Sequence, residues 1–253
     1  MMNHSNSNSD SMKVAGVDGC RAGWIVATVS LKNKAKGFDR LILDKFAIVK
    51  DFAEVIKRAK DSEIICVDIP VGLSDNEHQR LCDVQARRML GRPRASSIFT
   101  PPSRYCLWAV NYEQASSINL KYTGRKLNKQ SYNLIPKIHE VDDLMTPKLH
   151  KKVREIHPEI GFFVLNGQKA IVENKKSVRG RTKRLKLLDR IFGHIRSHLR
   201  KASNSGYSTD DALDAAVAAW TAAQAVRGRS FTLPERPETD GRGLRMEILC
   251  PRV

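Results

Sequence analysis

Aromatic residues are scarce in this chain, and long apolar runs are missing. Phe, Trp and Tyr make up 6% of its 253 residues, which argues against a surface of stacked rings of the kind that binds single-stranded nucleic acid. No stretch approaches the roughly 18 consecutive apolar residues of a membrane-spanning helix, and no secretory apolar segment is found. The sequence therefore predicts a cytoplasmic protein without a membrane span.

Cysteine is also sparse, and its spacing argues against two common structural roles. The five cysteines lie far apart, with no C-x-x-C pair. This spacing disfavours a closed zinc site of thiolates, and a disulfide framework is typical of much shorter chains. The odd number of cysteines fits a reducing compartment.

The chain has enough apolar residues for one large core. Hydrophobic residues make up 41% of the sequence, which suits a folded domain, and the length leaves little room for a second full one. The Ser- and Asn-rich residues 1–12 are expected to form a disordered tail. We expect a single domain over 13–253, with helical or basic insertions at about 74–150 and 166–205.

Positive charge dominates the sequence, and most of it lies in one third of the chain. Lys and Arg number 44 against 27 Asp and Glu, a formal net charge of +17. Residues 121–201 hold 21 Lys and Arg against 7 acids. Charge clustered in this way favours a surface for a polyanion, here nucleic acid, whether DNA or RNA. The alternative is charge that only keeps the protein soluble.

The hydrophobic pattern predicts an α/β fold that begins βββαβ. Three short β-branched or apolar segments, 13–18, 24–31 and 41–49, are expected to form an antiparallel meander. A helix over 51–60 and a continuous apolar strand over 63–69 follow. Such a strand is usually buried between two layers of helices.

The remainder of the chain is expected to be mostly helical. Helices are expected over 74–90, 103–117, 132–144, 182–201 and 208–226. A capping box at Ser74–Glu77 should open the first of them. The 182–201 helix is amphipathic, with a basic face opposite its apolar stripe. Two further strands are expected at 153–157 and 245–249.

Four aspartates are candidates for a metal site. Asp18 and Asp68 end the first and fourth predicted strands, and Asp211 and Asp214 lie three residues apart in one helix. If the strands are neighbours and the helix crosses them, the four carboxylates meet and repel each other unless a cation lies between them. Mg²⁺ or Mn²⁺ prefers such oxygen ligands, and a pair of these ions supports phosphoryl displacement.

Each of these acids also has a structural alternative. Asp18 precedes Gly19 in a common turn dipeptide, and Asp68 could cap a turn. Asp211 falls where a helix N-terminus favours acids. Asp214 lies too deep in its helix to be a cap.

Several motifs together resemble one family. The main ones are Gly16–Trp24, Asp68–Leu73, Glu155–Glu159 and Asp210–Ala215, and supporting ones are Arg80–Arg87, Ser96–Phe99 and Pro136–Asp142. They resemble the predicted RNase H-like nuclease family, catalogued as domain of unknown function 429. The resemblance implies an α/β fold with an RNase H-like core, a mixed five-stranded sheet flanked by helices, and a helical insertion after the fourth strand.

The resemblance also implies a site and an activity. The sequence resembles the Holliday-junction resolvase branch of the RNase H-like superfamily. In that branch a first-strand Asp, a fourth-strand acid and a D-x-x-D pair in the final helix hold the metals. The matching positions are Asp18, Asp68, Asp211 and Asp214. The fourth-strand acid is often Glu in that branch, and the shorter Asp68 reaches less far. A metal-dependent nuclease, which hydrolyses phosphodiester bonds with a carboxylate-bound Mg²⁺ or Mn²⁺ pair, is the function implied.

Other residues are candidates around this centre. Glu159, with His157, follows the predicted fifth strand as a candidate ligand or proton shuttle; the alternative for Glu159 is capping of a short helix. Arg21 and Lys137 are candidates for phosphate contacts, or else packing charges. Candidates for nucleic-acid contact on the exposed face of the 182–201 helix are Lys183, Arg184, Lys186 and Arg190.

Two other functions stay open. One is a nucleic-acid-binding protein without catalysis, although a site freed from metal need not keep crowded carboxylates. The other is an actin-like or sugar-kinase-like phosphotransferase, which shares the core. That class needs two such cores and a second glycine-rich phosphate motif, and the sequence indicates only one core.

Overall fold

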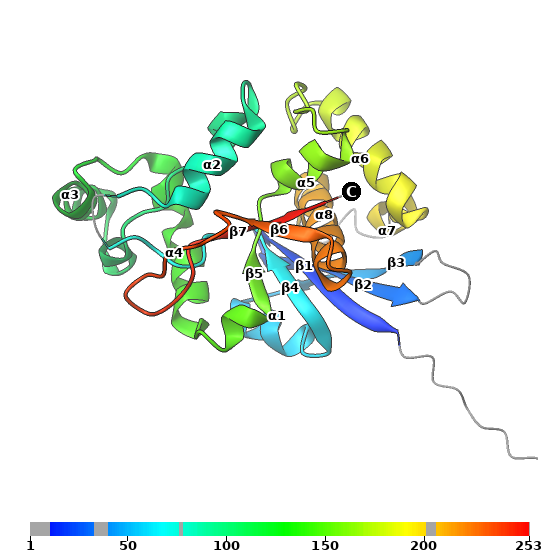
Figure 1. Ribbon diagram of the computed structural model, residues 1–253, viewed down its shortest axis with the longest axis horizontal. Coiled ribbons are helices and arrows are strands. Elements are labelled where there is room, and N and C mark those ends of the chain that lie inside the picture. Colours follow the sequence, from blue (N-terminus) through cyan, green and yellow to red (C-terminus); the bar gives the residue numbers. More distant parts are fainter. Residues whose placement is uncertain (1–10, 33–39, 76–77, 201–205, 253) are drawn as a thin grey trace, which may run out of the picture.

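A five-stranded sheet forms the centre of the molecule (Figure 1). The computed structural model describes residues 11–32, 40–75, 78–200 and 206–252. The strands are β1 (Met12–Cys20), β2 (Gly23–Lys32), β3 (Arg40–Val49), β4 (Ser62–Val67) and β5 (Val153–Glu155). Their order is β3-β2-β1-β4-β5, with antiparallel pairing from β1 to β3 and parallel pairing of β4 with β1 and β5. This topology confirms the predicted mixed five-stranded sheet.

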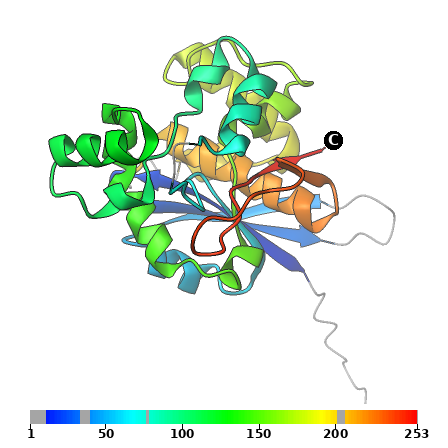
Figure 2. The same ribbon diagram turned by 60° about the vertical axis from the view of Figure 1, so that its left-hand side comes forward.

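Helices cover both faces of the sheet (Figures 1 and 2). On one face lies α8 (Thr209–Val226), with α5 (Pro158–Leu165) and α6 (Val178–Phe192) packed against it. The other face carries α1 (Phe52–Arg58) and α4 (Lys129–Leu144). Successive side chains of a strand point to opposite faces, so β1 contributes Val14 and Cys20 to the α8 side and Ala15 and Val17 to the other.

Small residues let α8 lie directly against β1. The alanines of α8 from Ala212 to Ala223 are all fully buried. A Cβ placed on Gly16 would lie 2.0 Å from the backbone nitrogen of Ala219 and 2.1 Å from the carbonyl oxygen of Ala215. The backbones of strand and helix are therefore in contact at Gly16, and no larger residue fits there without moving α8.

The chain between β4 and β5 is the predicted helical insertion. It holds α2 (Leu81–Leu90), α3 (Tyr112–Thr123), α4 and short 3-10 turns at Arg94–Ser97, Arg104–Trp108 and Leu149–Lys151. The prediction that α2 begins at Ser74 was wrong, because the helix starts at Leu81. The Ser74 hydroxyl instead donates to the carbonyl oxygen of His78 at 2.8 Å. Residues 76 and 77 of the predicted capping box lie outside the described residues.

Element boundaries differ from the sequence expectation at other places too. The predicted 103–117 helix is a 3-10 turn, Arg104–Trp108, followed by α3, which begins only at Tyr112. The predicted 182–201 helix is two helices, α6 and α7 (Ile195–Arg200), separated at Gly193 in the left-handed conformation, φ 71°. The last predicted strand is β7 (Ile248–Pro251), which pairs with β6 (Ser230–Leu233), a strand that the pattern did not predict. Of the predicted tail, residues 1–10 lie outside the described residues, and Met12 already begins β1.

Within the described ranges, no helix combines the length and the apolar character needed to cross a bilayer.

Substitution of Gly16 tests the contact between α8 and β1. The Gly16→Ala variant should lose about 3 kcal/mol or more of unfolding free energy, because the added methyl group meets backbone atoms that cannot rotate away. Urea denaturation would measure this. Lys13→Ala, an exposed position on the same strand, is the matched control and should change little. A Gly16→Ala variant as stable as the control would show that α8 lies farther from β1.

Candidate metal centre

Three carboxylates meet where α8 crosses the ends of β1 and β4. Val17 pairs with Val67 in the parallel register, and the backbone nitrogen of Asp68 donates to the carbonyl oxygen of Val17 at 3.0 Å. Asp18 and Asp68 are therefore the next neighbours along the two strands. Asp214 on α8 completes the group, in which one oxygen of each carboxylate lies within 4.8 Å of the others. β1 itself continues past Asp18 to Cys20, so Asp18 does not end the strand as predicted.

These carboxylates are held in an environment that disfavours their charge. Asp214 is 2% exposed, whereas Asp18 and Asp68 are half-buried. Burial raises the pKa of Asp68 to about 7 and that of Asp214 to about 6. Burial, together with the negative charges of Asp68 and Asp214, raises the pKa of Asp18 well above its usual range. The group is thus short of positive charge, which a divalent cation would supply.

A lysine already supplies part of that charge. Nζ of Lys175 lies 2.9 Å from Oδ2 of Asp214, and the negative charge of Asp214 is the main reason that the pKa of Lys175 is raised. The side chain of Lys175 is 44% exposed, so it can leave Asp214 without breaking a packed core. The donor set of three carboxylates fits a hard ion such as Mg²⁺ or Mn²⁺. Lys175 neutralises part of the negative charge that such an ion would neutralise.

Sequence reasoning missed Lys175 and the residue that holds its loop. Arg94 donates hydrogen bonds to the carbonyl oxygens of Ile171 and Glu173, each at 2.5 Å, and to that of Val172 at 2.9 Å. This contact joins the loop after α2 to the segment that carries Lys175. Neither Arg94 nor Lys175 belongs to a motif. For Lys175 the sequence offers only the general basicity of residues 121–201, and for Arg94 it offers no signal.

Asp211, the fourth predicted acid, is outside this group. Its Oδ2 accepts a hydrogen bond from the backbone nitrogen of Ser208 at 2.8 Å, and its own nitrogen donates to the Ser208 hydroxyl at 3.2 Å. These bonds form a capping box at the start of α8. Asp18, Asp68 and Asp214 are therefore the three acids that lie together, while the Asp211 carboxylate caps the helix and its charge adds to the raised pKa of Asp18. That Asp211 is a metal ligand stays a prediction.

Glu159 and His157 lie at the same cleft with their polar atoms already engaged. Oε1 of Glu159 accepts from Nη2 of Arg184 at 2.5 Å, and Arg94 is 3.9 Å from its other oxygen. Nδ1 of His157 accepts from the backbone nitrogen of Glu159 at 3.2 Å, and Nε2 is 3.3 Å from the carbonyl oxygen of Ser97. With Nδ1 accepting, Nε2 carries the proton of a neutral ring, in agreement with the pKa of His157, which burial lowers.

A cleft of about 360 Å³ opens onto the carboxylates. Three cationic side chains line it: Arg94, Lys137 and Lys175. Nζ of Lys137 donates to the carbonyl oxygen of Gly23 at 2.8 Å and lies 4.3 Å from the centre of the Trp24 ring. Arg21 lies in the exposed turn between β1 and β2 and is not among the described residues that line the cleft.

The basic residues of α6 separate into exposed and buried positions. Lys186 and Arg190 are exposed, and Lys183 lies 3.3 Å from Glu173 in a surface ion pair. The prediction that Arg184 is exposed was wrong, since it is 1% exposed, pairs with Glu159 and lies 5.3 Å from the Phe162 ring. Its spacing could have shown this, because Arg184 lies four residues before the buried Leu188, on the apolar stripe.

Comparison with known proteins gives one family and one structure. The family described as "Protein of unknown function (DUF429)" matches residues 16–239, a range that includes every acid named above. No curated protein matches the chain. Among solved structures, the chain is similar to a Thermus thermophilus RuvC structure at 15% sequence identity and a TM-score of 0.34, covering 86% of this chain and 97% of that one.

The burial of Asp68 predicts a stabilising substitution. Because the pKa of Asp68 is raised from its usual 3.8 to about 7, the folded state disfavours the charged form, and stability falls as pH rises between these values. At pH 8 without metal, Asp68→Asn should therefore raise the unfolding free energy by about 1–2 kcal/mol, with a smaller gain at pH 5. Urea denaturation in EDTA at both pH values measures this.

The exposed Asp61 provides the control. Asp61→Asn should leave stability unchanged at both pH values. If Asp68→Asn gave no gain at pH 8, or the same gain at pH 5, the folded state would not raise the pKa of Asp68.

Proposed function

We propose that this chain, which belongs to the family of proteins of unknown function DUF429, is a metal-dependent nuclease that hydrolyses phosphodiester bonds in nucleic acid. One observation carries the proposal: three carboxylates from β1, β4 and α8 converge within 4.8 Å at a cleft lined by cations. Such a group is unfavourable without a counterion. A nuclease needs this combination, because metal ions neutralise the centre while Lys and Arg attract the polyanion.

Asp18, Asp68 and Asp214 are the residues that would hold Mg²⁺ or Mn²⁺. Their oxygen atoms suit hard ions, and the half-buried position of Asp18 and Asp68 leaves them accessible from the cleft. A bound metal pair would supply an activated water and stabilise the leaving oxygen. The capping box of Asp211 fixes the start of α8 one turn before Asp214 and so supports the position of that ligand.

The remaining cleft residues act on the substrate and on the shape of the site. Lys175 balances Asp214 in the free protein and, being 44% exposed, can turn toward a phosphate. Glu159 serves as a positioning residue, because its ion pair with Arg184 links α5 to α6. Arg94 holds the segment that carries Lys175 and also lines the cleft, where its charge attracts phosphate.

The two alternative functions fit the site less well. A phosphotransferase of the actin or sugar-kinase type places its nucleotide between two cores, and the described residues form one five-stranded sheet beside the small β6–β7 pair. A purely binding protein has no use for three buried or half-buried acids whose pKa values are raised by burial and by neighbouring negative charges. Both observations favour hydrolysis.

Loss of one carboxylate tests catalysis. Asp18→Asn keeps the size of the side chain but removes a metal-holding charge, so Mn²⁺-dependent cleavage should fall by roughly three orders of magnitude or more. Single- and double-stranded DNA, RNA and a four-way junction are the substrates to assay. Circular dichroism should show an intact fold.

Asp143→Asn, whose parent side chain is 60% exposed on α4, is the matched control and should retain activity. Cleavage by Asp18→Asn within a few-fold of the unmodified protein would remove Asp18 from the site.

The exposed charges of α6 test the nucleic-acid surface. Replacing both Lys186 and Arg190 with Gln should weaken binding to all sequences alike. The log–log salt slope on duplex DNA should also flatten, by up to roughly 0.9 for each phosphate that the variant no longer neutralises. Fluorescence anisotropy in EDTA, over a series of salt concentrations, measures both effects.

The control is the double variant Lys57→Gln with Lys60→Gln, which removes two charges on α1 and just after it. It should leave the salt slope of binding unchanged, because these exposed residues lie on the opposite side of the sheet from α6. An equal effect of both double variants would indicate that net charge, and no particular surface, governs binding.

A further inference from the structure

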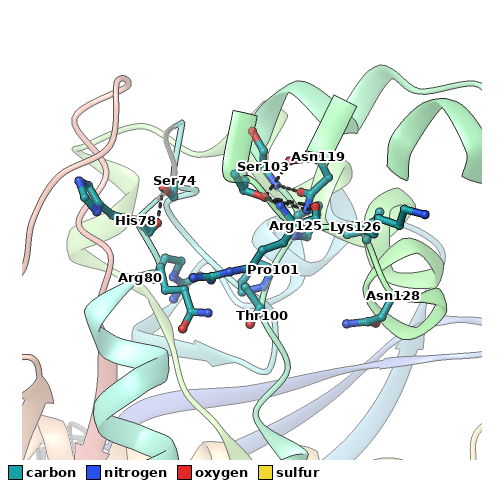
Figure 3. A pocket seen from close by; sticks show the side chains of 14 residues that line it. Ser74, His78, Arg80, Thr100, Pro101, Ser103, Asn119, Arg125, Lys126 and Asn128 are labelled. Carbon is teal, nitrogen blue, oxygen red and sulfur yellow. Dashed lines mark hydrogen bonds between the residues drawn. The ribbon is translucent and has the colours of Figure 1, made fainter. Parts of the chain in front are cut away.

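A second pocket lies beside the cleft and is separate from the three carboxylates (Figure 3). It has a volume of about 190 Å³ and lies between the segment before α2, the Thr100–Ser103 loop and the connection from α3 to α4. Figure 3 shows Ser74, His78 and Arg80 on one side of that loop, with Asn119 and Lys126 on the other. This volume is below the roughly 300 Å³ at which pockets for drug-sized ligands begin, so it suits a small group.

Two side chains that line this pocket carry buried polar atoms without a partner in the described part of the chain. Arg80 is 2% exposed; its Nη2 donates to Glu155 at 2.6 Å and its Nε to Sγ of Cys82 at 3.3 Å, but Nη1 has no partner. Ser103 is 1% exposed, and its hydroxyl is also unpartnered. Buried donors are almost always satisfied, so these two are donors that a ligand of this pocket could use.

The charge of the lining selects the kind of ligand. Arg80, Arg125 and Lys126 line the pocket, and the described lining residues include no Asp or Glu. Arg125 and Lys126 are exposed, so they can close over a ligand from the rim. An unpaired guanidinium nitrogen and a hydroxyl are both donors suited to an oxyanion. Arg80 is already paired with Glu155 and Asp83, so Arg125 and Lys126 carry the positive charge left for a ligand. Their two charges match a phosphate monoester, with a charge of about −1.5 to −2 at pH 7, better than the single charge of a phosphodiester.

The same two chain segments line the pocket and the cleft. Ser97 and Phe99 line the cleft, and the pocket begins at the next residue, Thr100. On α4 and the residues before it, Leu127 and Asn128 line the pocket, whereas Gln130 and Asn133 line the cleft. The Ser131 hydroxyl ties these segments together by donating to the carbonyl oxygen of Thr100 at 2.7 Å. A nucleic-acid strand that lies in the cleft can therefore place its end in the pocket.

We propose that this pocket binds the terminal phosphate monoester of a nucleic-acid strand whose neighbouring nucleotides lie in the carboxylate cleft. Arg80 and Ser103 would donate from the floor, and Lys126 would donate from the rim. That the ligand is a nucleic-acid strand rests on the proposed nuclease function. Recognition of its phosphate needs no metal and no cleavage. The pocket gives the protein a preference for strands that end in phosphate.

Binding in EDTA tests the pocket apart from catalysis. The probes are a fluorescent single-stranded DNA decamer with a 5′-phosphate, with a 3′-phosphate or with hydroxyl groups at both ends, together with adenosine monophosphate and adenosine. One of the phosphorylated decamers should bind roughly tenfold or more tightly than the hydroxyl form. Ser103→Ala and Lys126→Ala should each reduce that preference, whereas Asp18→Asn and Lys57→Ala should keep it.

The variants report on the pocket and not on the fold. Ser103→Ala removes an unpartnered buried hydroxyl, so the free protein should melt at the same temperature or higher, and Lys126 is exposed. Equal binding of the three decamers, or a preference that Ser103→Ala and Lys126→Ala leave intact, would overturn the proposal. So would a preference for adenosine monophosphate over adenosine without any preference among the decamers, because the ligand would then be a free nucleotide.

The two proposals fail separately. A phosphate preference that depends on Ser103 in a protein without metal-dependent cleavage would support the pocket and refute the nuclease. Cleavage that Asp18→Asn abolishes, in a protein indifferent to terminal phosphate, would do the opposite.

Discussion

The direct contact between α8 and β1 at Gly16 is the constraint on which the site depends. Because Gly16 has no side chain and α8 is built from alanines at this point, the helix backbone contacts the strand backbone. Asp18 lies two residues after Gly16 on the same strand face, and Asp214 lies one residue before Ala215, whose carbonyl oxygen faces Gly16. Parallel pairing with β4 then adds Asp68. The packing that holds the core together thus also forces three acids into one place.

The electrostatic consequence extends outward from that group. Burial raises the pKa of all three carboxylates, and neighbouring negative charges add to it. Positive charge surrounds the group: Lys175 pairs with Asp214, Arg184 pairs with Glu159, and Arg94 bonds to the loop before Lys175. None of these cations neutralises Asp18 and Asp68 directly by a contact in the described structure. The negative charges of Asp18 and Asp68 are therefore only partly compensated at the cleft, and such unfavourable electrostatics are common at functional sites.

Pattern and register predicted much of this arrangement. The five strands of the sheet, their βββαβ start and the meeting of Asp18, Asp68 and Asp214 follow from hydrophobic periodicity, the family motifs and parallel pairing. Asp211 caps α8, and a D-x-x-D spacing looks the same whether its first acid is a ligand or a cap. Lys175 and Arg94 act across long sequence separations and carry no local pattern. Arg184 is buried, contrary to the prediction, because its spacing places it on the apolar stripe of α6, and the basic composition of the helix hides this.

The central claim is that the three carboxylates form a site for divalent metal, and anomalous diffraction from crystals grown with Mn²⁺ tests it most directly. The account predicts an anomalous peak bounded by oxygen atoms of Asp18, Asp68 and Asp214, with the ammonium of Lys175 moved away from Asp214, because one cation replaces the other. Crystals that contain millimolar Mn²⁺ but show no peak there, with Lys175 still 2.9 Å from Asp214, would contradict it.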